Sequence, residues 1–216
     1  MYDFTVIVPV YNEEKKIKNV IDELKKYGYK YLIVDDGSTD DTLKIIKENT
    51  KYYESYPHNL GKGFAIKYGA DAVETDWIIL ADGDGQINLK SIEALFIPVK
   101  QNPDLKIVLG NRLLLHRGMP KLRYIANVVM SYIVSLITKQ YIADANSGIR
   151  LVHKDVFNLE SKCDRFDYDI EMLLLAAEAG YKIGHIPYTC SYTEEDNSKI
   201  NLVKDSIRFL KVILGG

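Results

Sequence analysis

The sequence of 216 residues is poor in cysteine, with only Cys163 and Cys190. Their spacing matches no metal-ligand motif, so neither a disulfide framework nor a zinc site is expected. We interpret both as ordinary semi-buried thiols of a reducing compartment.

The chain also lacks an excess of charge and a long hydrophobic run. Its formal net charge of -2 gives no general attraction for nucleic acid, so no nucleic-acid partner is predicted. The most hydrophobic long stretch, 125–137, is shorter than the roughly 20 apolar residues of a membrane span. Asn127, Ser131 and Ser135 also interrupt it. No signal-peptide pattern precedes the first strand pattern at Phe4, and we expect a cytoplasmic protein.

What the chain does contain is a regular alternation of strand and helix patterns. Strands are predicted at 4–10, 31–34, 52–55 and 77–80, with helices between them. This order predicts an α/β fold with one mostly parallel sheet and helices on both faces. We expect Asn12 to cap the first helix, and Ser38 or Thr39 to cap the second.

The second half of the sequence is less regular. Helices are predicted at 92–99, 122–138 and 167–179, and strands at 107–109, 149–152 and 181–187. From residue 200 the pattern is that of a basic amphipathic helix. The whole of 1–216 is interpreted as a single domain.

Polar clusters follow the first, second and fourth predicted strands, at 11–13, 35–40 and 82–86. Ligands bind outside the carboxyl ends of parallel strands, so these clusters should meet at one edge of the sheet. In the last cluster Gly83 separates Asp82 from Asp84. Two hard carboxylates suit Mg²⁺ or Mn²⁺, which usually bring a substrate phosphate with them. An ordinary Asp-Gly β-turn is the alternative.

Seven motifs in sequence order resemble the family-2 glycosyltransferases of the GT-A fold, and among them the polyprenyl (dolichyl) phosphate sugar transferases. They are VIVPVYNEE (6–14), IVDDGSTDDT (33–42), NLGKGFA (59–65), ADGDGQ (81–86), GNR (110–112), DANSGIR (144–150) and SKI (198–200). The resemblance implies a nucleotide-sugar-binding half over about 1–112 and an acceptor half over about 113–199. The amphipathic tail, 200–216, follows them.

The resemblance also implies roles for individual residues. Asp82, Asp84 and Gln86 would hold the divalent metal, Mn²⁺ or Mg²⁺, and Asn146 and Ser147 would line the acceptor side. The nucleotide-sugar donor would be bound by Pro9, Tyr11, Glu13, Asp35, Asp36, Lys62, Asp82, Gly83, Asp84 and Arg112. The catalytic candidates are Asp84, Arg112, Asp144 and Glu171.

The expected reaction is an inverting transfer of sugar from a GDP-mannose or UDP-glucose type donor to a polyprenyl (dolichyl) phosphate. An anionic lipid phosphate needs no general base. A sugar hydroxyl, as in cell-surface glycan synthesis, would need a carboxylate to take its proton, first Asp144, then Glu171, with Asp167 and Asp169 next. A nucleotide-sugar-binding protein without turnover is the remaining alternative.

One departure from the family pattern leaves the donor and the acceptor open. The lipid-phosphate transferases usually carry Arg-x-x-Gly before the terminal Ser-Lys, and this sequence reads Thr193-Glu194-Glu195-Asp196 there. The helix at 125–138 and the tail offer surfaces for peripheral association with the cytoplasmic face of a membrane. Both could instead pack on the sheet. No oligomeric state is predicted.

Overall fold

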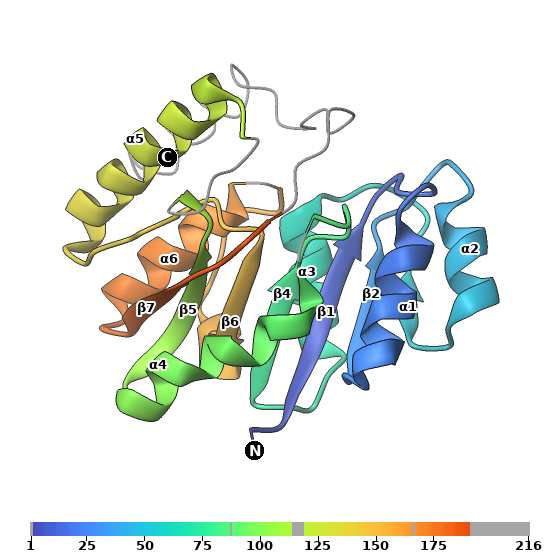
Figure 1. Ribbon diagram of the computed structural model, residues 1–216, viewed down its shortest axis with the longest axis horizontal. Coiled ribbons are helices and arrows are strands. Elements are labelled where there is room, and N and C mark those ends of the chain that lie inside the picture. Colours follow the sequence, from blue (N-terminus) through green and yellow to red (C-terminus); the bar gives the residue numbers. More distant parts are fainter. Residues whose placement is uncertain (1, 87, 114–118, 166, 191–216) are drawn as a thin grey trace.

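The computed structural model describes residues 2–86, 88–113, 119–165 and 167–190. Within them, seven strands form one sheet in the order β3-β2-β1-β4-β6-β5-β7, flanked by helices (Figure 1). The strands are β1 (Phe4–Val10), β2 (Tyr31–Asp35), β3 (Tyr53–Ser55), β4 (Trp77–Ala81), β5 (Leu105–Asn111), β6 (Ile149–His153) and β7 (Lys182–Pro187). The helices are α1 (Ile17–Tyr27), α2 (Thr42–Asn49), α3 (Lys62–Asp71), α4 (Phe96–Gln101), α5 (Lys121–Thr138) and α6 (Tyr168–Glu178), with short 3-10 helices η1 (Leu89–Leu95) and η3 (Lys154–Asn158).

The sheet is mostly parallel, as the sequence predicted, but β6 runs against its neighbours. β1 pairs in parallel with β2 and β4, while β6 lies antiparallel between β4 and β5. Ala81, the last residue of β4, therefore lies opposite Ile149, the first residue of β6. The loop before β6 thus reaches the same edge as the carboxyl ends of β1, β2 and β4.

Two hydrophobic cores lie on the two faces of the sheet. In β1, Val6 and Val8 belong to the core under α1, η1 and α4, while Ile7 belongs to the core under α3 and α6. In β4, Ile79 belongs to the same core as Val6 and Val8, and Ile78 belongs to the same core as Ile7. Strands with apolar residues on both faces are those of a sheet buried on both sides.

The predicted helix caps are wrong. α1 begins only at Ile17, and Asn12, with a φ of 53°, bonds instead to Thr39 through its side chain. α2 begins at Thr42, whose N–H donates to Asp40 rather than to Ser38 or Thr39. Each predicted cap is used to join the loop after β1 to the loop after β2. The helix predicted at 92–99 is also divided, into η1 and α4.

Helix α5 lies at the upper left in Figure 1, above α6 and β7. Its buried residues, Asn127, Ser131 and Val134, recur at helical spacing and face the protein. The opposite side exposes large apolar side chains: Leu122, Ile125, Val128, Val129, Tyr132, Leu136 and Ile137. Among the described helices, none has both the length and the hydropathy to cross a membrane.

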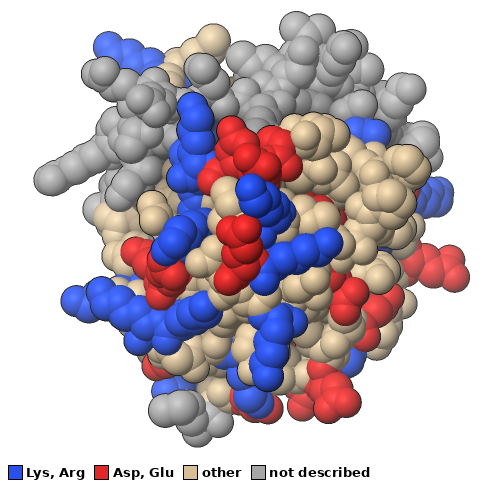
Figure 2. Space-filling view, turned by 90° about the vertical axis from the view of Figure 1, so that its right-hand side faces the viewer, with Lys and Arg blue, Asp and Glu red and all other residues tan. Residues whose placement is uncertain are grey.

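The side of the molecule that carries α1 and α2 has a mixed charge. Figure 2 shows basic and acidic side chains interspersed over that face. Lys18 and Asp22, one turn apart on α1, form an exposed ion pair of 2.6 Å. Such interspersed charges are typical of a solvated surface.

Candidate active site

The three polar clusters that follow β1, β2 and β4 meet at one edge of the sheet. The N–H of Asn12 donates to Ser38 Oγ at 3.0 Å, and that of Glu13 to Thr42 Oγ1 at 2.7 Å. Pro9 lies in β1 opposite Val34. Tyr11 and Glu13 follow at the edge itself, both half-buried. The sequence-based prediction that these loops converge is confirmed.

Asp35 and Asp36 are adjacent in sequence and both buried, yet their surroundings differ. The carboxylate of Asp36 accepts hydrogen bonds from Tyr56 Oη, Asn59 Nδ2 and the N–H groups of Leu60 and Gly61. It therefore fixes the segment that leads into α3. The carboxylate of Asp35 accepts the N–H of Ser38 through Oδ1, and among the described residues its buried Oδ2 has no hydrogen-bond partner.

Burial raises the pKa of Asp35, and repulsion from Asp36 and Asp40 adds to that shift, although hydrogen bonds from Ser38 oppose it. A buried carboxylate oxygen without a partner is costly. Asp35 Oδ2 is thus an acceptor available to a bound donor group, as the base or ribose of a nucleotide would supply.

The Asp82-Gly83-Asp84 turn directly follows β4 and packs tightly against β1. A Cβ on Gly83 would lie 2.4 Å from Val10 Cγ1, so no larger residue fits there. Asp84 Oδ1 accepts the N–H of Gln86 at 3.0 Å. Burial and then the charge of Asp82 raise the pKa of Asp84 to about 6.

The residues of this turn fit a hard divalent cation by their chemistry. Asp82 and Asp84 offer carboxylate oxygens and Gln86 an amide oxygen, the donors that Mg²⁺ and Mn²⁺ prefer. In the described part of the chain, no cluster of three or more His, Cys, Asp or Glu side chains forms a complete metal site. A cation here would depend on Gln86 and on substrate phosphate oxygens to complete its coordination.

A chain of alternating charges leads from the sheet interior to this turn. Lys62 Nζ lies 2.8 Å from Asp82 Oδ1 and 2.7 Å from Asp169 Oδ2, and Arg150 Nη2 lies 3.4 Å from Asp169 Oδ1. Burial alone would raise the pKa of Asp169, but Arg150 and Lys62 outweigh it and lower that pKa.

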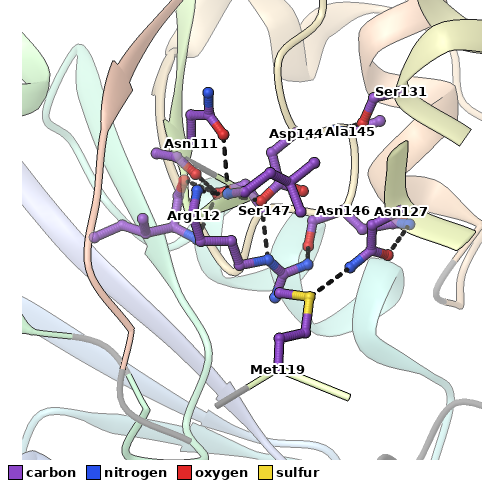
Figure 3. Close-up of polar contacts among 12 residues, drawn as sticks. Asn111, Arg112, Met119, Asn127, Ser131, Asp144, Ala145, Asn146 and Ser147 are labelled. Atoms are coloured by element: carbon purple, nitrogen blue, oxygen red, sulfur yellow. Dashed lines mark hydrogen bonds and ion pairs between the residues drawn. The ribbon is translucent and has the colours of Figure 1, made fainter. Parts of the chain in front are cut away.

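Arg112 and Asp144 form a second buried ion pair at the end of β5. Arg112 Nε donates to Asp144 Oδ2 at 2.9 Å, with the side chains 8% and 0% exposed, and Nη2 donates to the carbonyl of Asn146 (Figure 3). Asp144 Oδ1 has no hydrogen-bond partner within the part of the chain that the structure describes. The pair holds the guanidinium in a fixed orientation.

The loop 144–148 is fastened on both sides. Ser147 Oγ donates to the carbonyl of Gly110 at 2.6 Å, and the N–H of Ala145 donates to Ser131 Oγ on α5. Asn146 Nδ2 donates to Asn127 Oδ1, also on α5 (Figure 3). Asn146 therefore connects the buried side of α5 to Arg112, while Ser147 ties the loop to β5.

Comparison with known proteins agrees with this geometry. The family model described as "Glycosyl transferase family 2" matches residues 5–158, well over half of the chain. The chain belongs to glycosyltransferase family 2. The resemblance seen in the motifs is confirmed, and the protein is a glycosyltransferase with a GT-A fold.

Curated relatives of this glycosyltransferase come from archaea and eukaryotes. It is 31% identical to UDP-N-acetylglucosamine–dolichyl-phosphate N-acetylglucosaminyltransferase of Methanococcus voltae, over 88% of this chain and 86% of that protein. It is also 31% identical to dolichyl-phosphate β-glucosyltransferase of Saccharomyces cerevisiae, over 96% of this chain and 72% of that one. An uncharacterised protein of Methanocaldococcus jannaschii is 32% identical, over 90% of this chain and 84% of that protein.

Among solved structures, glucosyl-3-phosphoglycerate synthase from Mycobacterium tuberculosis in complex with uridine diphosphate is similar, with a TM-score of 0.75. The match covers 99% of this chain and 79% of that one at 17% sequence identity. Identity this low shows the common fold alone.

The carboxylate of Glu171 in this glycosyltransferase faces the segment 161–163. Its carboxylate accepts hydrogen bonds from Ser161 Oγ and from the N–H groups of Lys162 and Cys163, at 2.5, 3.0 and 3.0 Å. Burial would raise its pKa, but these bonds outweigh it and lower the pKa. The geometry favours a role in anchoring the 161–163 segment.

Sequence reasoning did not single out Arg150 or Gly148. Arg150 is 1% exposed and donates to the carbonyls of Ala145, Ser147 and Asp169. A Cβ on Gly148 would lie 2.4 Å from Asp82 Oδ2, so the glycine makes room for that carboxylate. Both lie in the DANSGIR motif, in which the sequence predicted a polar turn ending at Gly148 and a strand that begins at Ile149.

Proposed function

We propose that this glycosyltransferase transfers a sugar, with inversion, from a nucleotide diphosphate sugar to a polyprenyl (dolichyl) phosphate. The observation that carries the proposal is the meeting of three features at one edge of the sheet: the Asp82–Gln86 turn, Asp35 with its Oδ2 unpaired among the described residues, and the oriented Arg112. The two named relatives act on dolichyl phosphate according to their names, which supports a lipid-phosphate acceptor here.

The donor sits, in this proposal, across the carboxyl ends of β1, β2 and β4. Asp35 Oδ2 accepts a hydrogen bond from the base or ribose, and Pro9, Tyr11 and Glu13 line the nucleoside. Asp36 contributes by holding the loop 59–61 in place. Donors of the UDP-glucose and GDP-mannose types remain candidates, and the Methanococcus voltae relative favours a UDP-sugar.

Asp82, Asp84 and Gln86 would hold a divalent cation, which would supply positive charge to neutralise the leaving diphosphate. A solved neighbour of similar fold contains Mg²⁺ and uridine diphosphate, which supports that expectation. Arg112 and Lys62 add cationic stabilisation, and Arg112 is oriented for it by Asp144. In the displacement, an acceptor oxygen forms the new bond to C1, and the bond from C1 to the β-phosphate oxygen breaks. The nucleoside diphosphate leaves with the electron pair.

The acceptor lies, in this proposal, on the side of Asn146, Ser147 and α5. The exposed apolar side of α5 supports a lipid acceptor and peripheral contact with a membrane surface. The tail at 200–216, the other segment predicted to reach a membrane, lies outside the described residues. Cys163 and Cys190 are both free, which is consistent with the cytoplasmic face.

A sugar hydroxyl acceptor is the second candidate, and one observation favours it. Asp144 Oδ1 is buried and accepts no hydrogen bond from the described residues, so it offers a site for an acceptor proton. Turnover by this route would need Asp144 as a base, whereas transfer to a phosphate would need it only to orient Arg112. Binding without turnover is disfavoured, because the oxygen donors of the Asp82–Gln86 turn are all present.

The proposal is tested by incubating the protein with a panel of UDP- and GDP-sugars, Mn²⁺ and a lipid extract, and measuring sugar transferred to lipid. We expect transfer from one donor class, lost on chelation of the metal. Asp84→Ala should lower turnover by at least about a hundredfold, the scale of removing one electrostatic stabiliser, with circular dichroism unchanged. Metal-independent transfer, or an active Asp84→Ala variant, would contradict the proposed site.

A further inference from the structure

Lys62 forms an ion pair with one oxygen of Asp82, a carboxylate that the proposed reaction assigns to the metal. Its Nζ lies 2.8 Å from Asp82 Oδ1, with the two side chains 16% and 33% exposed. A dication approaching that oxygen meets a positive charge already in place. In this state Asp82 is therefore neutralised by the protein itself.

The fold holds Lys62 in that position from behind. A Cβ on Gly61 would lie 2.5 Å from the carbonyl oxygen of Asp164, and one on Gly63 2.5 Å from Tyr168 Cβ. The two glycines let the start of α3 press against the segment that begins α6. Lys62, between them, is carried to within 2.7 Å of Asp169 Oδ2.

Asp169 itself cannot follow Lys62 if the lysine moves. Arg150 donates to the Asp169 backbone carbonyl at 2.5 Å and approaches its carboxylate at 3.4 Å. Arg150 is in turn tied to two further carbonyls and is 1% exposed. Asp82 is anchored through its backbone, because its N–H donates to the carbonyl of Gly148, and its Oδ2 lies over that glycine. Lys62, on a flexible stem, is thus the movable member of the series.

We propose that Lys62 couples metal binding to nucleotide binding, acting as the counter-ion of Asp82 until a diphosphate draws its ammonium group away. A diphosphate at this edge brings negative charge that competes with Asp82 for Lys62. Once Lys62 turns toward it, Asp82 Oδ1 is released for the cation. By linkage, each ligand then raises the affinity for the other by the same factor.

The inference rests on the proposed function, and it predicts effects of opposite sign from one substitution. Lys62→Met removes the charge and keeps much of the stem. Mn²⁺ alone should then bind more tightly than to the wild type, by about three- to tenfold, because its competitor is gone. The nucleoside diphosphate alone should bind more weakly. A merely structural lysine would not tighten Mn²⁺ binding when removed.

The experiment measures Mn²⁺ binding by the electron paramagnetic resonance of the free ion, without and with UDP or GDP, corrected for Mn²⁺ bound to nucleotide in solution. In the wild type we expect the nucleotide to raise Mn²⁺ affinity by about tenfold or more, and in Lys62→Met by much less. The matched control is Lys67→Met, on the same helix and paired with the exposed Asp164, which should behave as wild type.

The double variant Lys62→Met/Asp169→Asn removes one charge of each sign. It replaces Lys62→Met in the same Mn²⁺-binding measurement if the single variant does not fold. Mn²⁺ binding that is unchanged or weaker in the folded Lys62 variants, or coupling equal to the wild type, would overturn the inference alone. A wild type that binds neither Mn²⁺ nor either nucleotide would overturn the proposed function as well.

Discussion

At the scale of single residues, Asp35 and Asp36 show how neighbouring carboxylates acquire different tasks. Asp36 is surrounded by donors from the segment before α3, whereas no described residue donates to the buried Oδ2 of Asp35. A carboxylate with every oxygen bonded stabilises the fold. One with an unpaired oxygen costs stability, and that cost is recovered only when a ligand donates to it.

This contrast predicts opposite outcomes for two conservative substitutions. Asp36→Asn should lower the free energy of unfolding by about 1–3 kcal/mol, because charge-assisted hydrogen bonds are lost. Asp35→Asn should leave it unchanged or raise it, while weakening nucleoside diphosphate binding by about tenfold, the effect of one lost hydrogen bond to a charged group. Urea denaturation and calorimetric titration measure the two effects.

The sign for Asp35 follows from its raised pKa. The protonated form is favoured by folding, so its contribution to stability is present at low pH and lost as the pH rises through the folded-state pKa. At neutral pH the Asp35→Asn variant does not carry the destabilisation that the buried, ionised Asp35 carboxylate causes. A large destabilisation by Asp35→Asn, comparable with that of Asp36→Asn, would show that Asp35 is instead a structural acceptor.

Glu171 offers a similar test of anchoring against catalysis. Its lowered pKa means that its contribution to stability is present above its ordinary pKa and lost as the pH falls through the lower, folded-state value. Glu171→Gln should therefore cost about 1–3 kcal/mol at pH 7, with the difference from wild type shrinking on acidification. Turnover of the folded variant should stay near the wild-type level.

The exposed Glu178 on the same helix provides the control, since Glu178→Gln should change neither quantity. A fall in kcat for Glu171→Gln, with the free energy of unfolding unaltered both at pH 7 and at acidic pH, would restore Glu171 as a candidate base.

At the scale of elements, α5 has two faces with different roles. Ile125, Val129 and Leu136 recur at spacings of four and seven residues on its exposed side. On the buried side, Asn127 and Ser131 hold the loop of Asn146 and so connect α5 to Arg112. The helix therefore has an apolar outer surface joined by hydrogen bonds to the proposed acceptor side.

Replacing Ile125, Val129 and Leu136 by Gln should weaken binding to phosphatidylcholine vesicles that contain polyprenyl phosphate. Each buried aliphatic side chain is worth about 1.5–3 kcal/mol, so the loss should exceed about tenfold. Folding should be preserved because the three side chains are 56%, 51% and 61% exposed. Vesicle flotation measures the binding.

Ile97→Gln supplies the control, because Ile97 is 52% exposed but lies on α4. It should bind vesicles as the wild type does. Equal flotation of the triple variant and the wild type would remove α5 as a membrane contact.

Element boundaries were predictable where apolar runs were continuous. β1 spans Phe4–Val10 in both prediction and structure, and β4 differs by one residue, because buried β-branched and aliphatic runs mark such strands. The caps were not predictable. Asn12 and Ser38 have the side chains of helix caps, but each found a partner in the neighbouring loop, a contact that only the assembled sheet provides.

At the scale of the whole molecule, one antiparallel strand decides what the site contains. Were β6 parallel, the loop of Asp144 would lie at the opposite edge from Asp82. Its reversal places Gly148 against Asp82 and brings Asp144 beside Arg112. Strand direction depends on pairing between distant segments, so local periodicity could not reveal it.

The convergence of the first three polar loops was predictable, because it follows from the β-α-β order and the rule for parallel sheets. The series Arg150, Asp169, Lys62 and Asp82 was not. Its members come from β6, α6, α3 and the turn after β4, and only their packing brings the charges together.

The central claim is that the acceptor is a lipid phosphate, and the most direct measurement compares two acceptors that differ only in that group. The protein, with the donor and Mn²⁺, is given either polyprenyl phosphate or the corresponding polyprenol, and lipid-linked sugar is quantified by mass spectrometry. We predict a sugar phosphodiester from the polyprenyl phosphate and no product from the polyprenol. Transfer to polyprenol, or to a saccharide hydroxyl in preference to the polyprenyl phosphate, would contradict the account.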